Sequence, residues 1–225
     1  MTENFTTTRA LERILGLTAF TAGAVDIISF AGLGGVFASA MTGNLAFLGL
    51  YLARFSFFSA LGSALALVGF VAGGVSGTLL CRGQNQHTAL TTLLAFETVL
   101  LIIATPIWLI TSHHGGTLGA DVLILLLSVS MGVQSIVGKR VNLSNIPTVV
   151  FTSTLTNIVI AITDMLATGN YVLPKDTKRQ CVSFLLYFLG ALCAGYCVFF
   201  KLKILIFLPV AVVAYAFALE RGRSE

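Results

Sequence analysis

The chain alternates between long apolar stretches and short polar ones, and this pattern predicts a series of membrane-spanning helices. A helix needs about 20 apolar residues to cross the hydrocarbon core, and six stretches approach or reach that length. They are predicted at Leu15–Leu33, Phe57–Leu80, Leu90–Ile110, Leu118–Val137, Val182–Phe200 and Ile204–Leu219. The polar, Thr-rich residues 1–11 are expected to form a frayed tail before the first span.

Two further helices are interrupted or marginal in length. A Gly-rich break at Gly32, Gly34 and Gly35 leads into Met41–Ala53, which is too short to cross a bilayer comfortably. The segment Thr148–Ala167 follows Pro147 and is long enough to span on length alone. Broken backbone at membrane depth is stable only where protein or a water-filled cavity surrounds it. We therefore expect function to be organised around Val36–Leu50.

Composition fixes the class of protein. Of the 225 residues, 56% are hydrophobic and 10% are charged, whereas soluble domains carry about 25% charge. The chain is therefore expected to be one all-α membrane domain, residues 1–225, with the lipid bilayer as its main partner. The net charge of +4 does not indicate nucleic-acid binding, because the basic residues lie in short clusters between apolar runs.

The basic residues also predict topology, since cytoplasmic loops carry an excess of Lys and Arg. With six spans and a cytoplasmic N-terminus, ten basic residues lie inside and three outside. With eight spans the division is eight to five, so six spans are favoured, with both termini cytoplasmic at the inner membrane. A mixed arrangement, in which only the second short helix crosses, stays open. Ala38-Ser39-Ala40 also has the form of a signal-peptidase site, but the apolar run before it is too long and contains Asp26, so we expect a retained first span.

Three short sequences recur in the same order in the two halves of the chain. Gly23–Ile27 resembles Gly132–Ile136, Met41–Leu45 resembles Phe151–Leu155, and Gly69–Gly74 resembles Gly190–Gly195. These similarities predict a pseudo-symmetric internal repeat with halves at about 12–111 and 117–219. With six spans the halves are inverted. Interrupted helices in corresponding places of two such halves indicate the binding site of a transporter.

Asp26 is the strongest single candidate for chemistry. A carboxylate at bilayer depth costs a few kcal/mol, so it normally faces a cavity or a partner. It is interpreted as a site that couples transport to a proton or cation, and the alternative is a protonated Asp that holds a neighbouring helix. Glu97 is a second intramembrane carboxylate, without a counterpart in the other half. Its candidate functions are to pair with a cation or to relay a proton, and the favoured alternative is that it has no such function.

Polar residues at the starts of the two short helices form the rest of the candidate site. Thr42, Gly43 and Asn44 offer unpaired N–H groups and a positive dipole end to an anionic or polar ligand. The compatible alternative is a helix start capped by Thr42 or Asn44. The counterparts in the second half suit ligand hydrogen bonds but also hold helices together. They are Gln134, Thr152, Ser153, Thr154 and Asn157.

No cofactor, metal or enzyme signature is found in the sequence. Cys81, Cys181, Cys193 and Cys197 lack metal-ligand spacing and are expected to pack. The three histidines fall in predicted loops. Motifs of hydrolases, metalloproteases and phosphate-binding loops are missing, so the protein is not expected to be an enzyme.

The stretch GAVDIISFAGLGGVFASAMTGNLAFLGL, residues 23–50, resembles the signature of the YoaK-type family of multi-pass bacterial membrane proteins. Ser128–Gln134 (SVSMGVQ) and Thr148–Thr156 resemble its second motif, except that Ser153 stands where the family often has glycine. The resemblance implies about six spans and a transport role without an established substrate.

The sequence thus favours a secondary transporter or permease for a small polar solute, in which Asp26 couples or gates. The rival interpretation is a non-transporting sensor, assembly factor or scaffold whose polar groups lock helices together. A membrane enzyme ranks third. Substrate, coupling ion and oligomeric state are not specified by the sequence.

Overall fold

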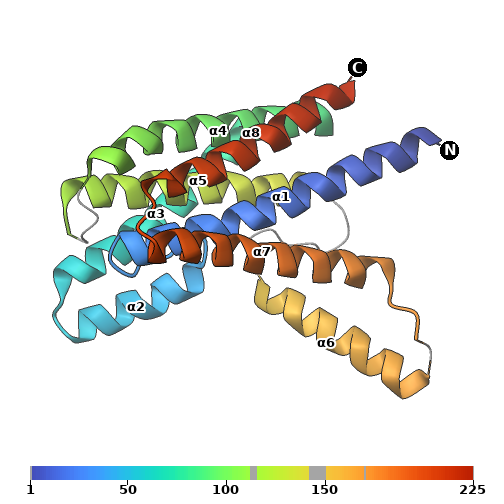
Figure 1. Ribbon diagram of the computed structural model, residues 1–225, viewed down its shortest axis with the longest axis horizontal. Helices are drawn as coiled ribbons and strands as arrows, with labels where there is room; N and C mark the ends of the chain where they lie inside the picture. Colours follow the sequence, from blue (N-terminus) through green and yellow to red (C-terminus); the bar gives the residue numbers. More distant parts are fainter. Residues whose placement is uncertain (1, 112–115, 142–150, 170, 225) are drawn as a thin grey trace.

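A computed structural model describes the backbone of residues 2–111, 116–141, 151–169 and 171–224 (Figure 1). These residues form eight α-helices and two short 3-10 helices. Their bounds are α1 Thr2–Gly32, α2 Met41–Ala53, α3 Phe57–Leu80, α4 Gln86–Ile110, α5 Leu118–Val141, α6 Phe151–Thr168, α7 Lys175–Phe199, η1 Lys203–Ile206, α8 Phe207–Arg221 and η2 Gly222–Ser224.

Six of the described helical units are long and apolar enough to cross a membrane: α1, α3, α4, α5, α7 and the run of η1 with α8. The predicted all-α membrane fold is confirmed. The other two helices are shorter than a hydrocarbon core of about 30 Å, because α2 has 13 residues and α6 has 18, or roughly 20 and 27 Å. In Figure 1, α2 lies toward the end of the molecule away from the termini, and α6 lies toward the end that carries them.

Polar contacts gather six helix ends at the end of the bundle that carries both termini, called here the N/C end (Figure 1). Glu12 near the start of α1 pairs with Arg179 near the start of α7, with 2.7 Å between Nε and Oε1. Arg140 Nη2 at the end of α5 donates to the Cys81 carbonyl, just after α3. His87 Nε2 lies 2.9 Å from the carbonyl oxygen of Glu220, which joins the start of α4 to the end of α8.

These contacts decide how often the chain crosses. Since α5 ends and α7 begins at the N/C end, the segment that contains α6 leaves and returns at the same end. Since α1 starts and α3 finishes at the N/C end, the segment that contains α2 begins and ends at the opposite one. Six helical units thus run between the two ends of the bundle, which is the arrangement that the six-span prediction requires.

Glycines allow two pairs of helices to cross at very short range. At Gly23 on α1 an added Cβ would overlap the Tyr187 carbonyl oxygen, and at Gly190 on α7 it would overlap that of Phe20. A methyl group at Gly73 on α3 or at Gly132 on α5 would likewise overlap the backbone of the facing helix. Backbones this close gain van der Waals and Cα–H···O contacts, which drive helix association in lipid.

The two crossings correspond to each other when each helix of the first half of the chain is matched to its counterpart in the second half. Helix α1 then corresponds to α5 and α3 to α7, so the α1–α7 crossing becomes the α5–α3 crossing. Gly23 and Gly132 take equivalent places, as the sequence similarity predicts, whereas Gly190 matches Gly73, one helical turn beyond Gly69. The repeat itself stays a prediction, and this packing is what it leads us to expect.

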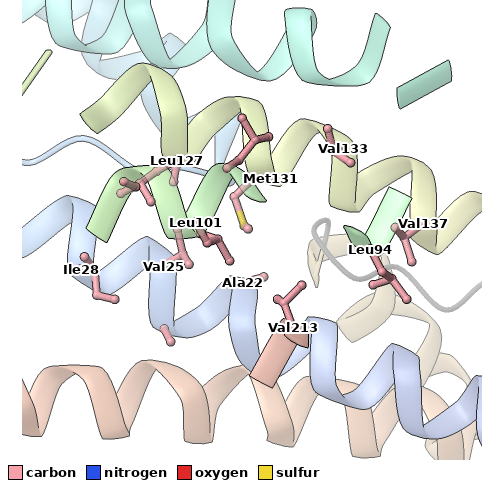
Figure 2. Packing of buried hydrophobic residues seen from close by; sticks show 14 of the residues in the cluster. Ala22, Val25, Ile28, Leu94, Leu101, Leu127, Met131, Val133, Val137 and Val213 are labelled. Carbon is pink, nitrogen blue, oxygen red and sulfur yellow. The ribbon is translucent and has the colours of Figure 1, made fainter. Parts of the chain in front are cut away.

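The core lies among α1, α4, α5 and α8 (Figure 2). Side chains without exposed surface meet there, among them Val25, Leu101, Met131 and Val213. By contrast, α2 and α6 each pack mainly on one neighbour, α3 and α7 respectively. Many large apolar side chains elsewhere are exposed, as lipid-facing positions require.

Several helix starts differ from the predicted ones. Residues 2–11, expected as a frayed tail, continue α1, because Leu11 and Ile14 are already buried against other helices. Helices α4 and α7 begin earlier than predicted, and the first turn of α4 includes His87, expected in a loop. Residues 148–150 of the predicted Thr148–Ala167 segment lie outside the described part of the chain.

Candidate functional site

The break between α1 and α2, residues 33–40, is folded back against the protein. Gly34 and Gly35 have φ angles of 88° and 81°, a region that favours glycine, and they turn the chain out of α1. The Gly35 N–H donates to the Phe30 carbonyl, which closes the end of that helix. Leu33, Val36, Ala38 and Ser39 are buried, so the break is surrounded by protein as the sequence predicts.

Asn44 holds this break from the α2 side. Its Oδ1 accepts from the Phe37 N–H at 3.0 Å, and its Nδ2 donates to the Phe37 carbonyl at 2.6 Å. The amide thus pairs with both backbone groups of one residue, and its side chain has no exposed surface. Gly43 lies against the same segment, since a Cβ there would be 3.3 Å from the Phe37 ring. The predicted cap by Thr42 or Asn44 is wrong, because the start of α2 has no side-chain cap hydrogen bond and Asn44 bonds the preceding break instead.

Asp26 fastens the break to two helices at once. Its Oδ1 accepts from the Ser39 N–H, and its Oδ2 accepts from the Ser39 hydroxyl and from the Tyr187 hydroxyl, each at 2.7 Å. Asp26 is 1% exposed and belongs to α1, Ser39 to the break, and Tyr187 to α7. Three short bonds satisfy a buried carboxylate, where an unmet polar group is costly.

The α1–α7 crossing explains why Tyr187 reaches Asp26. Gly23 lies one turn before Asp26 and contacts the backbone of Tyr187, so α7 runs directly past the carboxylate. Ser39 and Tyr187 are the site residues that sequence reasoning missed. The signal for Tyr187 was a phenol in the middle of a span, because a buried Tyr hydroxyl usually requires a hydrogen-bond partner.

Of the other candidate site residues in the first half of the chain, one lies on the surface and one in the core. Thr42 is exposed on α2 and does not contact the Asp26 group. Glu97 on α4 has no exposed surface, and neither of its carboxylate oxygens has a hydrogen-bond partner in the described part of the chain. Glu97 thus differs from Asp26, whose oxygens are both engaged.

The second-half candidates show the same division. Gln134 on α5 is buried, and its Nε2 donates to the Thr18 carbonyl of α1 at 2.8 Å. On α6, Thr154 is buried whereas Thr152, Ser153 and Asn157 are exposed. The pattern on α6 repeats that of α2, because Thr154 matches buried Asn44 and Thr152 matches exposed Thr42. The structure therefore brings together Asp26 and the break held by Asn44, and leaves Thr42, Thr152 and Asn157 on the surface.

An open groove of about 580 Å³ lies along α1, α7 and α8. Its lining includes Arg9 and Arg13 toward the N/C end, Phe20 and Leu186 further along the helices, and the exposed side chains of Val182 and Tyr215. Phe20 precedes Asp26 by six residues, or about 9 Å along the helix axis. The groove thus approaches the level of the Asp26–Tyr187 contact from one side of the membrane.

The fold and the buried polar groups define an all-α, multi-pass membrane protein with a carboxylate-fastened break after its first span. The chain belongs to the family described as "Protein of unknown function (DUF1275)", whose model matches residues 14–219. It is 31% identical over 185 residues to the UPF0700 transmembrane protein YoaK of Bacillus subtilis (strain 168), and the match covers 80% of each chain. No solved structure matches the chain. The predicted family is confirmed.

Proposed function

We propose that the protein is a secondary transporter of a small polar solute, and not an enzyme, in which Asp26 gates the broken helix after α1. The observation that carries the proposal is the bonding of Asp26, a buried intramembrane carboxylate that fastens interrupted backbone to α7. Intramembrane ionisable groups are costly and typically mark substrate or ion pathways. Interrupted helices near such groups form the binding sites of many transporters.

The N/C-end groove supports this proposal. Its volume is in the range of small-molecule sites, and its lining residues lie along α8 and along α1 and α7, the two helices that Asp26 connects. Release of the Ser39 and Tyr187 bonds would free the break from α7 and extend this path toward the opposite end. We place the N/C end in the cytoplasm, at the inner membrane, because ten of the thirteen basic residues lie toward it.

One observation favours the rival function, a non-transporting sensor, assembly factor or scaffold. All three donors to Asp26 come from the protein itself, which a purely structural locking role also explains. Interhelical hydrogen bonds of this kind stabilise membrane proteins by about 1–2 kcal/mol at most. The two functions therefore differ in what happens when Asp26 loses its charge but keeps its bonds.

The substitution Asp26→Asn distinguishes the transporter from the non-transporting scaffold. The Asn Oδ1 can keep the Ser39 N–H bond, while its Nδ2 donates to the Ser39 and Tyr187 hydroxyls, which accept as well as donate. We expect the variant to express, remain monodisperse and lose no more than about 2 kcal/mol of stability. Its gradient-driven uptake should be abolished, because the amide cannot change charge during the cycle.

The measurement starts with a solute screen by thermal stabilisation of the wild type in detergent, since a ligand of the folded state must raise its midpoint. A solute found in this way is then followed as gradient-driven flux in proteoliposomes of wild type and Asp26→Asn. Asp164→Asn, the same change at an exposed carboxylate on α6, is the matched control and should retain flux. Full flux in Asp26→Asn would remove the gating role. Failure of a broad solute panel to shift the wild type would favour the scaffold.

A further inference from the structure

Glu97 is a buried acid that the Asp26 gate does not use. It has no exposed surface and no described donor or cation for either oxygen. The other buried glutamate in the described spans, Glu220, has Arg223 as an ion-pair partner at 2.7 Å. An ionised carboxylate without a partner in an apolar core is far more costly than a neutral carboxylic acid. Burial alone therefore requires a proton on Glu97.

Gln134 provides an acceptor for that proton. Because its amide nitrogen donates to the Thr18 carbonyl, its Oε1 is directed elsewhere, and this oxygen is buried with no described hydrogen-bond donor. The identity of the two amide ends is fixed by that contact, since a carbonyl oxygen accepts only from the NH₂ end. The core thus contains an amide oxygen in need of a donor.

Helix register places Glu97 and Gln134 at the same depth. A methyl group added at Gly77 would lie 3.3 Å from Leu93 of α4 and 3.3 Å from Ile136 of α5. Leu93 and Ile136 therefore lie at about the same height along these two antiparallel helices. Figure 2 draws Leu94 and Leu101 of α4 and Met131 and Val137 of α5 in the same buried cluster. Glu97 falls between Leu94 and Leu101 on one face of α4, and Gln134 falls between Met131 and Val137 on one face of α5.

Asp26 on α1 is another acid of this core, because α1 contacts α4 where Gly32 meets the Trp108 ring, but its oxygens are already engaged by Ser39 and Tyr187. The other charged groups described on α1, Arg9, Glu12 and Arg13, lie toward the N/C end. The titratable and charged groups on α5 and α8 and after α3 lie toward the helix ends, apart from Tyr215, which is 57% exposed. They are Asp121, Lys139 and Arg140 on α5 and Tyr215, Glu220 and Arg221 on α8, with Cys81 after α3. The side chain of Lys203 on η1 lies outside the described residues. Glu97 thus differs from Asp26 and Glu220 in having no described hydrogen-bond donor or cation.

We propose that Glu97 is the proton-binding residue of this protein, held here as a neutral carboxylic acid that donates to Oε1 of Gln134. The proton site itself does not depend on the proposed transport function; only its role in coupling transport to protons rests on that function. The carboxylate takes a proton from hydronium at one face of the membrane and leaves water. It returns the proton to water at the other face, with no change of oxidation state. Binding of one proton thus neutralises the Glu97 carboxylate and gives Oε1 of Gln134 a hydrogen-bond donor.

The test is the infrared carbonyl band of a protonated carboxylic acid in wild-type protein whose glutamates carry ¹³C in the side-chain carboxyl group. The chain has five glutamates, Glu3, Glu12, Glu97, Glu220 and Glu225, and the label separates them from aspartates. At neutral pH we expect one isotope-shifted band, which disappears at high pH as the proton leaves. Absence of that band in the wild type would overturn the proposal without any variant.

Two variants assign the band. Glu97→Gln should remove it and still fold, because the new amide can donate to Gln134, whereas the matched control Glu12→Gln should keep it. Gln134→Leu should keep the band but move it to higher frequency, since the acid loses its acceptor. A band that survives Glu97→Gln, or that Gln134→Leu does not move, contradicts the assignment. Loss of the band on adding Na⁺ at constant pH would identify a cation site instead.

Flux then distinguishes the two proposals. If both hold, Glu97→Gln loses proton-driven accumulation of the solute but keeps exchange of labelled for unlabelled solute, which requires no net proton movement. Full proton-driven accumulation in Glu97→Gln would overturn the coupling role. If wild type shows the band but transports nothing in the panel, the proposed transport function fails while the proton site stands.

Discussion

At the scale of single residues, Asn44 supplies the bonds that secondary structure would otherwise supply. Residue 37 lies in a break between helices, where its N–H and carbonyl have no helical partner. The Asn44 amide meets both groups, with its oxygen toward the N–H and its nitrogen toward the carbonyl. Buried backbone groups are nearly always paired, so this side chain is what allows Phe37 to lie within the protein.

Asn44→Ala is therefore expected to be strongly destabilising. It leaves two backbone groups of Phe37 unpaired, and each such group costs about 1–3 kcal/mol when it stays buried. Asn44→Asp should also destabilise, because it keeps an acceptor for the N–H but places a carboxylate against the Phe37 carbonyl. The measurement is the thermal unfolding midpoint in detergent.

Thr42→Ala is the control for that experiment. Thr42 lies two residues earlier in the same motif and is exposed, so its replacement should change stability by less than about 0.5 kcal/mol. Equal midpoints for the two alanine variants would show that the break does not depend on the Asn44 amide.

The residue scale is also where prediction from sequence was partial. Asp26, Asn44, Glu97 and Gln134 were predicted to matter because polar groups are rare in spans, and all four are buried. Ser39 and Tyr187 were not predicted as partners of Asp26. Their contact depends on where α7 crosses α1 and on how the break folds back, and neither is encoded by local periodicity.

At the scale of elements, the two glycine crossings hold the bundle together. In lipid there is little hydrophobic gain from bringing apolar helices together, so close packing of small residues must supply the attraction. The crossings of α1 with α7 and of α3 with α5 have backbone against backbone, which no side-chain movement can relieve. Each crossing therefore tolerates only glycine at its centre.

The neighbouring residues Gly73 and Gly74 offer a matched test. A Cβ at Gly73 would overlap the Val129 carbonyl, whereas one at Gly74 would meet no atom within 4 Å. Gly73→Ala should destabilise by about 3 kcal/mol or more, since overpacking against backbone requires the helices to separate. Gly74→Ala should be neutral or slightly stabilising, because alanine has the higher helix propensity.

Gly190→Ala and Gly195→Ala repeat the comparison on α7, where the first meets the Phe20 carbonyl and the second meets nothing within 4 Å. Both pairs are compared by detergent melting and by the fraction of monodisperse protein. Loss of fold in Gly74→Ala, or tolerance of Gly73→Ala, would contradict the described packing.

The positions of the helices along the chain were predictable, whereas their starts and their pairing were not. Apolar run length and small-residue content located all six spans and α2, because those properties are local. The sequence did not show that α6 is a short helix like α2, because α6 is apolar enough to resemble a span. It also did not show that each of these helices has a buried and an exposed face. The ion pair of Glu12 with Arg179, a contact between distant parts of the sequence, shows that the chain returns to the N/C end before α7.

At the scale of the whole molecule, charge and geometry point to the same arrangement independently. The charge distribution favoured six spans because it gathered ten basic residues on one side. The structure gathers the same helix ends through the contacts of Arg179, Arg140 and His87. If α6 crossed the membrane, Lys175, Lys178 and Arg179 would lie on the opposite face from Glu12, and that ion pair would break.

Single cysteines in a background without Cys81, Cys181, Cys193 and Cys197 test this topology. Gln84→Cys and Lys178→Cys lie at the N/C end, whereas Arg54→Cys and Leu118→Cys lie at the opposite end. With the N/C end in the cytoplasm, a membrane-impermeant thiol reagent should label the second pair in intact cells. The first pair should be labelled only after the membrane is opened, because the positive-inside rule places that end in the cytoplasm. Labelling of all four sites after opening is the control for reactivity. Labelling of Lys178→Cys but not Gln84→Cys in intact cells would mean that α6 crosses, and the inverted arrangement of the two halves would then be wrong.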